Sequence, residues 1–304
     1  MTDSIFRAYT FKNLDKNTLA LVSAANQIIR EYHPQSLTIR QIFYQFVGRG
    51  LLPNDKRSYG LIQSIVKKGR LNGLISWTAI EDRTRGLVGL EYETKGPIGA
   101  IEGVKNKYRC DLWARQPIRP EIWIEKDALI GVIGDICVDL RVDYFACRGY
   151  SSLSEQWRAG RRLANYIIKG QRPIVFHLGD HDPSGIDMTR DNARQLARFA
   201  GVPVQVTRLA LNWDQIQRYT PPPNYAKVSD SRATEYISRY GTSCWELDAL
   251  DPKVIVELIR NAVEQVRDEK IWEESLSEES EDLETLDEII QNLGKSGDGG
   301  VDDF

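Results

Sequence analysis

The chain has 304 residues, of which 41% are hydrophobic and 27% are charged. This length predicts two domains, each large enough to bury a core. The sequence has no run of about 18 apolar residues, which excludes a membrane-spanning helix, and its N-terminus lacks the apolar segment typical of a signal peptide. The four cysteines lie far apart without a CxxC pair. We therefore expect a cytoplasmic protein with neither a zinc ribbon nor a disulfide framework.

The near-neutral balance of 40 Lys and Arg against 43 Asp and Glu hides a segregated charge. Residues 273–304 hold twelve acids and one base, a net charge of −11, whereas residues 1–272 hold 39 bases and 31 acids, a net charge of +8. The acidic tail is poor in apolar residues, so we expect it to be largely disordered apart from one short amphipathic helix. We interpret it as a solubilising tail, with a partner-docking helix or a strip that competes with DNA as the alternatives. The basic body remains compatible with a nucleic-acid partner.

Three helices and an extended stretch are predicted near the N-terminus. Helical spacing of apolar residues indicates a helix over residues 17–32 and another over about 57–68. Between them, Thr38 and Gln41 have the spacing of a capping box, which predicts that a helix begins there. Residues 74–86 then form an extended stretch that ends in a basic tip. This order of elements is typical of a winged-helix domain.

Basic residues cluster at the end of the third predicted helix and on the basic tip. Between residues 40 and 85 there are nine bases and three acids, a balance that suits a surface facing DNA phosphates. A solvated helical face is the alternative. The residues that we expect to contact DNA in this region are Lys67, Lys68, Arg70, Arg83 and Arg85.

A tyrosine lies off the apolar stripe of the second helix. That stripe recurs at helical spacing on Ile39, Ile42, Phe43, Phe46 and Val47. Tyr44 lies roughly 120° from the middle of the stripe, on the flank that it shares with Arg40. A partly buried helix tyrosine is the simpler interpretation. In the functional alternative, Arg40 holds a phosphate and the phenol oxygen of Tyr44 attacks it.

From residue 120 onward the pattern changes to alternating strands and helices. Strands are predicted over residues 120–125, 143–149, 173–180 and 202–209, with helices between them. This alternation predicts an α/β fold in which a parallel sheet is covered by helices on its faces. Sheets of this kind bind ligands at the carboxyl ends of their strands.

Three carboxylates occur at those strand ends. Glu125 ends the first strand, and Asp180 and Asp182 lie at the end of the third. Carboxylate oxygens suit Mg²⁺, with Mn²⁺ as an alternative. The EKDA motif that begins at Glu125 is weak evidence by itself. The DHDPSG motif that begins at Asp180 is equally weak, because this sequence is also a good turn and helix start. Together at one edge of a sheet they predict a metal site.

Three stretches, EIWIEKDA, RGYSS and LGDHDPSGIDM, resemble the conserved stretches of a Toprim domain. Over roughly residues 35–210 the chain resembles the A subunit of topoisomerase VI and its meiotic double-strand-break relatives. In that family the winged helix carries an R-[DE]-I-[YF]-Y motif whose last tyrosine is the DNA nucleophile. Residues 40–44 read RQIFY here, with Gln41 in the acidic position.

The resemblance implies a winged-helix domain followed by a Toprim domain, a Rossmann-like fold with a mainly parallel sheet. It implies that Tyr44 attacks double-stranded DNA and becomes joined to a 5′ end, while Mg²⁺ stabilises the phosphate and the leaving 3′ oxygen. It also implies a homodimer, in which the tyrosine of one subunit works with the metal site of the other, and a separate ATPase subunit. The implied metal ligands are Glu125, Asp180 and Asp182, and Lys126 would contact phosphate.

We expect a winged-helix domain over residues 1–115, a Toprim domain with a C-terminal extension over 116–262, and a helix with a largely disordered tail over 263–304. Two alternatives to the tyrosine enzyme stay open. One is a Toprim nuclease that hydrolyses DNA without the tyrosine, and the other is a non-catalytic DNA-binding subunit.

Charged residues also lie among apolar neighbours in the region before the tail. For Asp230, Arg232, Glu246 and Asp248 we favour a salt-bridged structural loop. A role for Glu246 or Asp248 as an extra metal-site acid is the alternative. Residues 251–274 predict one amphipathic helix, whose apolar side includes Val254, Leu258 and Val263.

Overall fold

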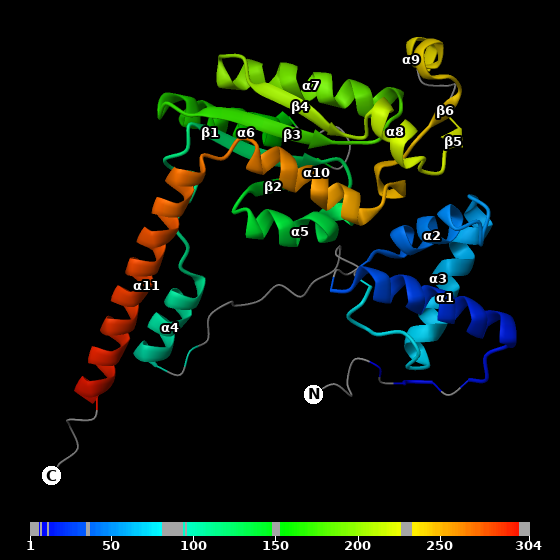
Figure 1. Cartoon of the computed structure of the whole chain (residues 1–304), viewed down its shortest axis with the longest axis horizontal. Helices are drawn as coiled ribbons and strands as arrows, with labels where there is room; N and C mark the ends of the chain where they lie inside the picture. Colours follow the sequence, from blue (N-terminus) through cyan, green and yellow to red (C-terminus); the bar gives the residue numbers. More distant parts are fainter. Residues whose placement is uncertain are drawn as a thin grey trace, which may run out of the picture.

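The computed structural model describes residues 6, 8–10, 12–34, 37–80, 94, 96–147, 153–225 and 233–297. It is an α/β protein whose elements are drawn in chain order, from blue to red, in Figure 1. The helices and strands are α1 (Lys16–Tyr32), α2 (Ile39–Gly48), α3 (Lys56–Leu71), α4 (Pro97–Lys107), β1 (Ile118–Ile124), α5 (Ile130–Asp139), β2 (Asp143–Ala146), α6 (Leu153–Ile168), β3 (Arg172–Leu178), α7 (Pro183–Ala200), β4 (Gln205–Ala210), α8 (Trp213–Tyr219), β5 (Asn224–Tyr225), α9 (Ala233–Tyr240), β6 (Ser243–Cys244), α10 (Pro252–Glu264) and α11 (Glu269–Gly297), with short 3₁₀ turns η2 (Asp127–Leu129) and η3 (Leu247–Ala249).

The three predicted N-terminal helices are present as α1, α2 and α3. The predicted capping box also forms: the Gln41 N–H donates to the Thr38 hydroxyl over 3.2 Å, and the Thr38 N–H donates to the Gln41 side-chain oxygen over 2.8 Å. Gln41 is buried. Gln41 therefore completes the capping box of Thr38, the N-cap of α2, as its third helical residue.

The apolar stripes of these helices meet in one core. Its buried residues include Val22, Ile28, Ile42, Phe46, Ile62 and Ile65. After α3, the described residues 74–80 contain a single parallel bridge between Leu37 and Ile80 and no longer strand. The basic tip with Arg83 and Arg85 lies outside the described residues. The described part of this region therefore shows three helices, and the wing of a winged helix stays a prediction.

The predicted parallel sheet is confirmed. Four strands, all parallel, run in the order β2-β1-β3-β4. Along β1 and β3 the buried side chains alternate between two cores, because successive residues of a strand point to opposite faces. Ile122 and Ile124 enter the core beneath α5 and α10, whereas Trp123 enters the core beneath α6 and α7. Figure 1 shows α7 on one face of the sheet and α5 and α10 on the other. A sheet covered on both faces has only its strand ends open to ligands.

The sheet and the three N-terminal helices have separate cores, as two domains would. Leu112 and Trp113 lie in the core of the sheet, so the segment just before the predicted boundary at residue 115 packs with the second domain. The two units touch directly. The Tyr32 hydroxyl donates to Asp251 over 2.7 Å, and α2 packs against η3.

The prediction of a largely disordered tail is wrong for most of its length, because α11 runs from Glu269 to Gly297. Trp272 is buried in the core of the sheet, where its ring lies 5.4 Å from that of Trp113. Glu279 is also buried, and it accepts hydrogen bonds from Arg141 and from the backbone of Cys110. The acids that predicted disorder are thus partly neutralised by basic residues of the body. Further along, α11 packs against α4, as Figure 1 shows.

The region predicted as one helix over residues 251–274 is divided between α10 and α11. The buried residues of α10 are Pro252, Ile255, Ile259 and Val263, so two of the three residues expected on the apolar side, Val254 and Leu258, lie at its edge. A short antiparallel pair, β5 with β6, was not predicted. No described helix has a stretch both long and apolar enough to cross a membrane.

Candidate active site

The loop after β3 is built around the start of α7. Asp182 is the N-cap of this helix, and its Oδ1 accepts the Gly185 N–H over 2.6 Å, while Pro183 occupies the first helical turn. Gly185 lies so close to the loop that a Cβ there would be 2.2 Å from the Asp180 carbonyl oxygen. The DHDPSG sequence thus supplies a cap, a helix start and a close approach, and together they fix Asp180 in place.

Arg208, near the end of β4, ties the same loop together from beneath. Its guanidinium donates to the carbonyls of Gly179 and Gly185 over 2.9 and 2.8 Å, and to the Thr189 hydroxyl over 2.8 Å. It also donates to the Asp180 and Leu211 carbonyls. Burial lowers the pKa of Arg208, and the nearby site carboxylates oppose that effect. The arginine is therefore both a five-bond clamp and a buried positive charge beneath the acids.

Glu125 and Asp180 are adjacent at the carboxyl edge of the sheet. Glu125 directly follows β1, and its Oε2 accepts the backbone N–H of Asp180 over 2.8 Å. Burial, together with the charge of Asp180, raises the pKa of Glu125 to about 7. Burial also raises the pKa of Asp180, against the opposing effect of Lys126. Because the charge of Asp180 disfavours ionisation of Glu125, the pair is stabilised by positive charge nearby.

A segment from far along the chain closes the site. His181 and Trp245 form an antiparallel bridge, with N–H···O distances of 2.8 and 3.0 Å. The bridge brings Leu247 beside the loop, where its N–H donates to Asp180 Oδ1 over 2.8 Å. The two acids that flank Leu247, at positions 246 and 248, are thereby delivered to the edge of the sheet.

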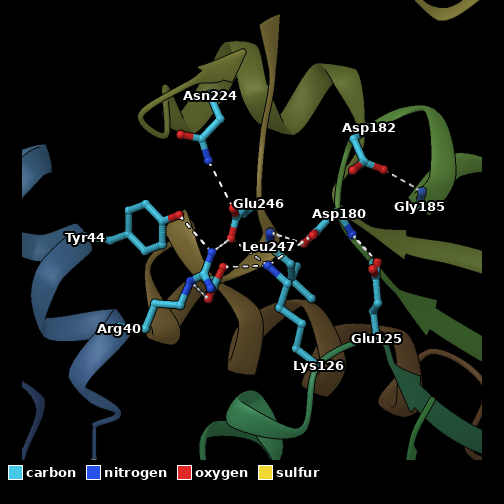
Figure 2. Close-up of polar contacts among 12 residues, drawn as sticks. Arg40, Tyr44, Glu125, Lys126, Asp180, Asp182, Gly185, Asn224, Glu246 and Leu247 are labelled. Carbon is cyan, nitrogen blue, oxygen red and sulfur yellow. Dashed lines mark hydrogen bonds and ion pairs between the residues drawn. The ribbon is translucent and has the colours of Figure 1, made fainter. Parts of the chain in front are cut away.

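Lys126 lies among three acids, Asp180, Glu246 and Asp248, which we call the acidic cluster (Figure 2). Its ammonium nitrogen is 2.8 Å from Glu246 Oε2, 3.0 Å from Asp248 Oδ1 and 3.0 Å from Asp180 Oδ2. An ammonium group has three N–H donors, so these three oxygens saturate it. Burial alone would lower the pKa of Lys126, but the charges of Asp248 and Asp180 outweigh it and raise that pKa. Lys126 therefore carries a positive charge at neutral pH.

Arg40 enters the cluster from the N-terminal domain. It pairs with Glu246, and its Nε lies 2.7 Å from Asp248 Oδ2. The Asp248 side chain is 1% exposed, so its charge depends on these two basic partners. The favoured interpretation of positions 246 and 248 as a salt-bridged loop is confirmed, and the partners are Arg40 and Lys126. Asp230 and Arg232 lie outside the described residues.

Tyr44 lies next to Arg40 on the same face of α2. The Arg40 Nη2 is 3.5 Å from the Tyr44 hydroxyl, and the guanidinium lies 5.8 Å from the ring centroid. Tyr44 is only 5% exposed. Burial raises the pKa of Tyr44 and the Asp248 charge adds to the rise, so the phenol is protonated at neutral pH. The predicted pair on the flank of the helix thus lies against the acids of the other domain.

A polar cavity of about 630 Å³ opens among these groups. Its lining includes two basic residues, three acids and one amide: Arg40, Lys126, Asp180, Asp182, Glu246 and Asn224. A cavity of this size and polarity can admit a phosphodiester segment with its bound water.

The three predicted metal ligands do not form one group in the structure. Glu125 and Asp180 are adjacent, whereas Asp182 caps α7 through Gly185. Among the described residues, no three His, Cys, Asp or Glu side chains are arranged to hold a metal ion. Lys126 is the cation that the carboxylates surround. Their chemistry nevertheless fits Mg²⁺ or Mn²⁺, because hard carboxylate oxygens already hold one cation at this edge of the sheet.

The residues predicted to contact DNA have different places. Lys67 and Lys68 are exposed at the end of α3. Arg70 donates to the carbonyls of Trp77 and Ile80, so its guanidinium holds the turn that follows α3. Arg70 thus has a role in the fold, and its role in DNA contact stays a prediction.

Two features of the site were missed from the sequence. Arg208 lies within an ordinary strand pattern, and the only signal was an arginine at a strand end next to the site loop. The pairing of Arg40 with Glu246 joins residues 206 positions apart, and no local spacing predicts such a contact.

Comparison with known proteins adds no family to these observations. No protein-family model matches the chain, and no curated protein matches its sequence. The chemistry of the site therefore rests on its own residues.

Proposed function

We propose that this chain is a metal-dependent DNA-cleaving enzyme resembling the A subunit of topoisomerase VI, in which Tyr44 attacks a phosphodiester. The observation that carries the proposal is the direct contact between the two halves of the predicted site. Arg40, which lies beside Tyr44, is paired with the acids that surround Lys126 at the edge of the sheet. Arg40, the neighbour of the nucleophile candidate, therefore lines the same polar cavity as Asp180, Asp182 and Glu246.

The proposed step is a transesterification. The Tyr44 hydroxyl loses its proton, the bond from its oxygen to phosphorus forms, and the bond from phosphorus to the 3′ oxygen breaks. The 3′ oxygen takes up a proton, and the 5′ end stays linked to the tyrosine. No other bond changes, so the energy of the phosphodiester is kept in the new ester.

Two basic residues would act on the phosphate. Arg40 is within reach of the Tyr44 hydroxyl, so its guanidinium can stabilise charge on the attacked phosphate. Lys126 lines the same cavity and can contact a second phosphate oxygen. Glu125, Asp180 and Asp182 would hold Mg²⁺, with Mn²⁺ as the alternative. The ion, when bound, would supply Lewis-acid stabilisation of the phosphate and of the leaving oxygen.

One observation favours a second candidate, a Toprim nuclease in which water attacks. Tyr44 is buried, and its pKa is raised rather than lowered. A phenol in this state needs a base and some exposure before it can attack. Hydrolysis does not need the phenol to become exposed, because water can enter the cavity, where a carboxylate can take its proton.

A covalent-adduct assay separates the candidates. The protein is incubated with supercoiled double-stranded DNA and Mg²⁺ or Mn²⁺, denatured, and tested for protein attached to 5′ ends. We expect an adduct that is lost in Tyr44→Phe and kept in the matched variant Tyr59→Phe, a tyrosine of the same core. Free 5′ phosphates that persist in Tyr44→Phe would establish the hydrolase instead. Absence of any cutting with either metal would leave a DNA-binding subunit.

The homodimer and the separate ATPase subunit also belong to this proposal. Mixing Tyr44→Phe with Glu125→Gln tests whether the tyrosine and the carboxylates act across subunits. If they do, the mixture regains adduct formation that neither variant shows alone. If they act within one chain, the mixture stays inactive.

A further inference from the structure

The acidic edge of the sheet is neutralised by the protein's own cations. Lys126 uses all three donors on carboxylates, at 2.8 to 3.0 Å. Arg40 pairs with two of the same acids. Asp180 is therefore engaged by an ammonium group, although it is one of the residues that would hold a divalent cation.

An ammonium ion and a divalent cation cannot both lie beside the same carboxylate oxygen at low cost. Their charges repel, and the burial of the site weakens the screening that water would give. A divalent cation that binds Asp180 must therefore displace Lys126 or share the acid with it. The displaced lysine needs a new anion, because an unpaired buried ammonium is costly.

DNA supplies that anion. Lys126 and Arg40 line the polar cavity, and the Arg40 side chain is 40% exposed. Each has a long flexible stem, so each can turn toward the cavity without a change in the backbone. A phosphate that enters the cavity would meet both cations.

We propose that, on DNA binding, Lys126 leaves Asp180 for a phosphate oxygen and so frees this carboxylate for the divalent cation, while Arg40 stays paired with Asp248. This inference rests on the proposed function, since it takes DNA as the anion and the carboxylates as the metal site. DNA and the metal then bind cooperatively. By linkage, each ligand raises the affinity for the other by the same factor.

The test measures Mn²⁺ binding, from the paramagnetic resonance of the free ion, with and without a short DNA duplex. All proteins carry Tyr44→Phe, which removes the adduct and any cleavage that depends on the tyrosine. We expect the duplex to raise Mn²⁺ affinity about tenfold, an ordinary size for coupled sites. Lys126→Met should bind Mn²⁺ about tenfold more tightly without DNA and gain little when the duplex is added. Lys126→Arg, which keeps the charge, should retain the coupling.

Asp180→Asn identifies the site, because it should lose the tight Mn²⁺ binding and leave only ions attracted by the duplex itself. Unchanged Mn²⁺ affinity on adding DNA, or weaker binding in Lys126→Met, would overturn the proposal. If circular dichroism shows that Lys126→Met does not fold, duplex binding by Glu246→Gln tests the exchange instead. This change frees both cations from a shared acid and should tighten duplex binding, whereas unchanged or weaker binding overturns the exchange.

Failure of the exchange and failure of the proposed function give different results. An adduct without Mn²⁺–DNA coupling excludes only the exchange. Coupling without an adduct or any cutting excludes the enzyme while leaving the exchange in place.

Discussion

Replacing Arg208 by lysine separates the geometry of the clamp from its charge. The guanidinium makes five hydrogen bonds, four to backbone carbonyls and one to the Thr189 hydroxyl. A lysine keeps the positive charge beneath the acids, but it has three donors at a single point and cannot span the fork.

The magnitude follows from the bonds that lysine cannot make. At least two of the five are lost, and a hydrogen bond to a charged group contributes about 1.5–3 kcal/mol. We therefore expect Arg208→Lys to lower the free energy of unfolding by about 3 kcal/mol. Because the clamp fixes the loop that carries Asp180, Mn²⁺ binding should weaken as well.

Urea unfolding followed by tryptophan fluorescence measures this loss. The matched control is Arg194→Lys on α7, an exposed arginine paired with Asp191 three positions away, which should stay within about 0.5 kcal/mol of the wild type. An Arg208→Lys protein that also stays within that range would refute the reasoning, because it would show that the fork contacts contribute nothing.

Two further predictions concern the acidic edge and the C-terminal helix. With its pKa raised to about 7, Glu125 contributes stability that is fully present below about pH 4.5 and is lost as pH rises through 7. Without divalent ions, the wild type should therefore lose up to about 3 kcal/mol relative to Glu125→Gln between pH 4.5 and 8; a pH-independent difference between the two urea curves would contradict this. Burial lowers the pKa values of His177 and His181 to about 3 and 4, so these residues lower the free energy of unfolding as pH falls. Because both proteins contain these histidines, their effect cancels in the difference between wild type and Glu125→Gln. Trp272→Ala should cost about 3–5 kcal/mol and speed amide exchange along α11; a wild-type α11 with no exchange protection would rule out the folded tail.

Much of the fold follows from local sequence patterns. The alternation of strands and helices after residue 120 predicted the parallel sheet, because both its faces are buried and each strand is a short apolar run. The capping box at Thr38 and the stripe of α2 were also readable locally. The tail could not be predicted in this way. Its composition indicated disorder, whereas α11 is held by contacts with distant parts of the chain: Trp272 enters a core made by other elements, and Glu279 pairs with Arg141.

The site divides in the same way. Glu125, Asp180, Asp182 and the neighbouring pair on α2 could be selected because each stands at a strand end or on a helix flank. The ion pairs that Lys126 and Arg40 make with the acids could not be predicted from the sequence. The partners of Lys126 lie at least 54 positions away along the chain, so only the folded sheet and the bridge to Trp245 bring them together.

That bridge also fixes when the site can exist during synthesis. Asp180 and Asp182 leave the ribosome 66 residues before Glu246 and Asp248, which corresponds to roughly 3–13 s of translation. During this interval Lys126 and Arg40 lack two of their acids, and α2 has no surface of the sheet domain to pack on. A nascent or prematurely ended chain therefore lacks the ion pairs through which Glu246 and Asp248 join Arg40 to Lys126, and the complete charge cluster forms only after residue 248 has been synthesised.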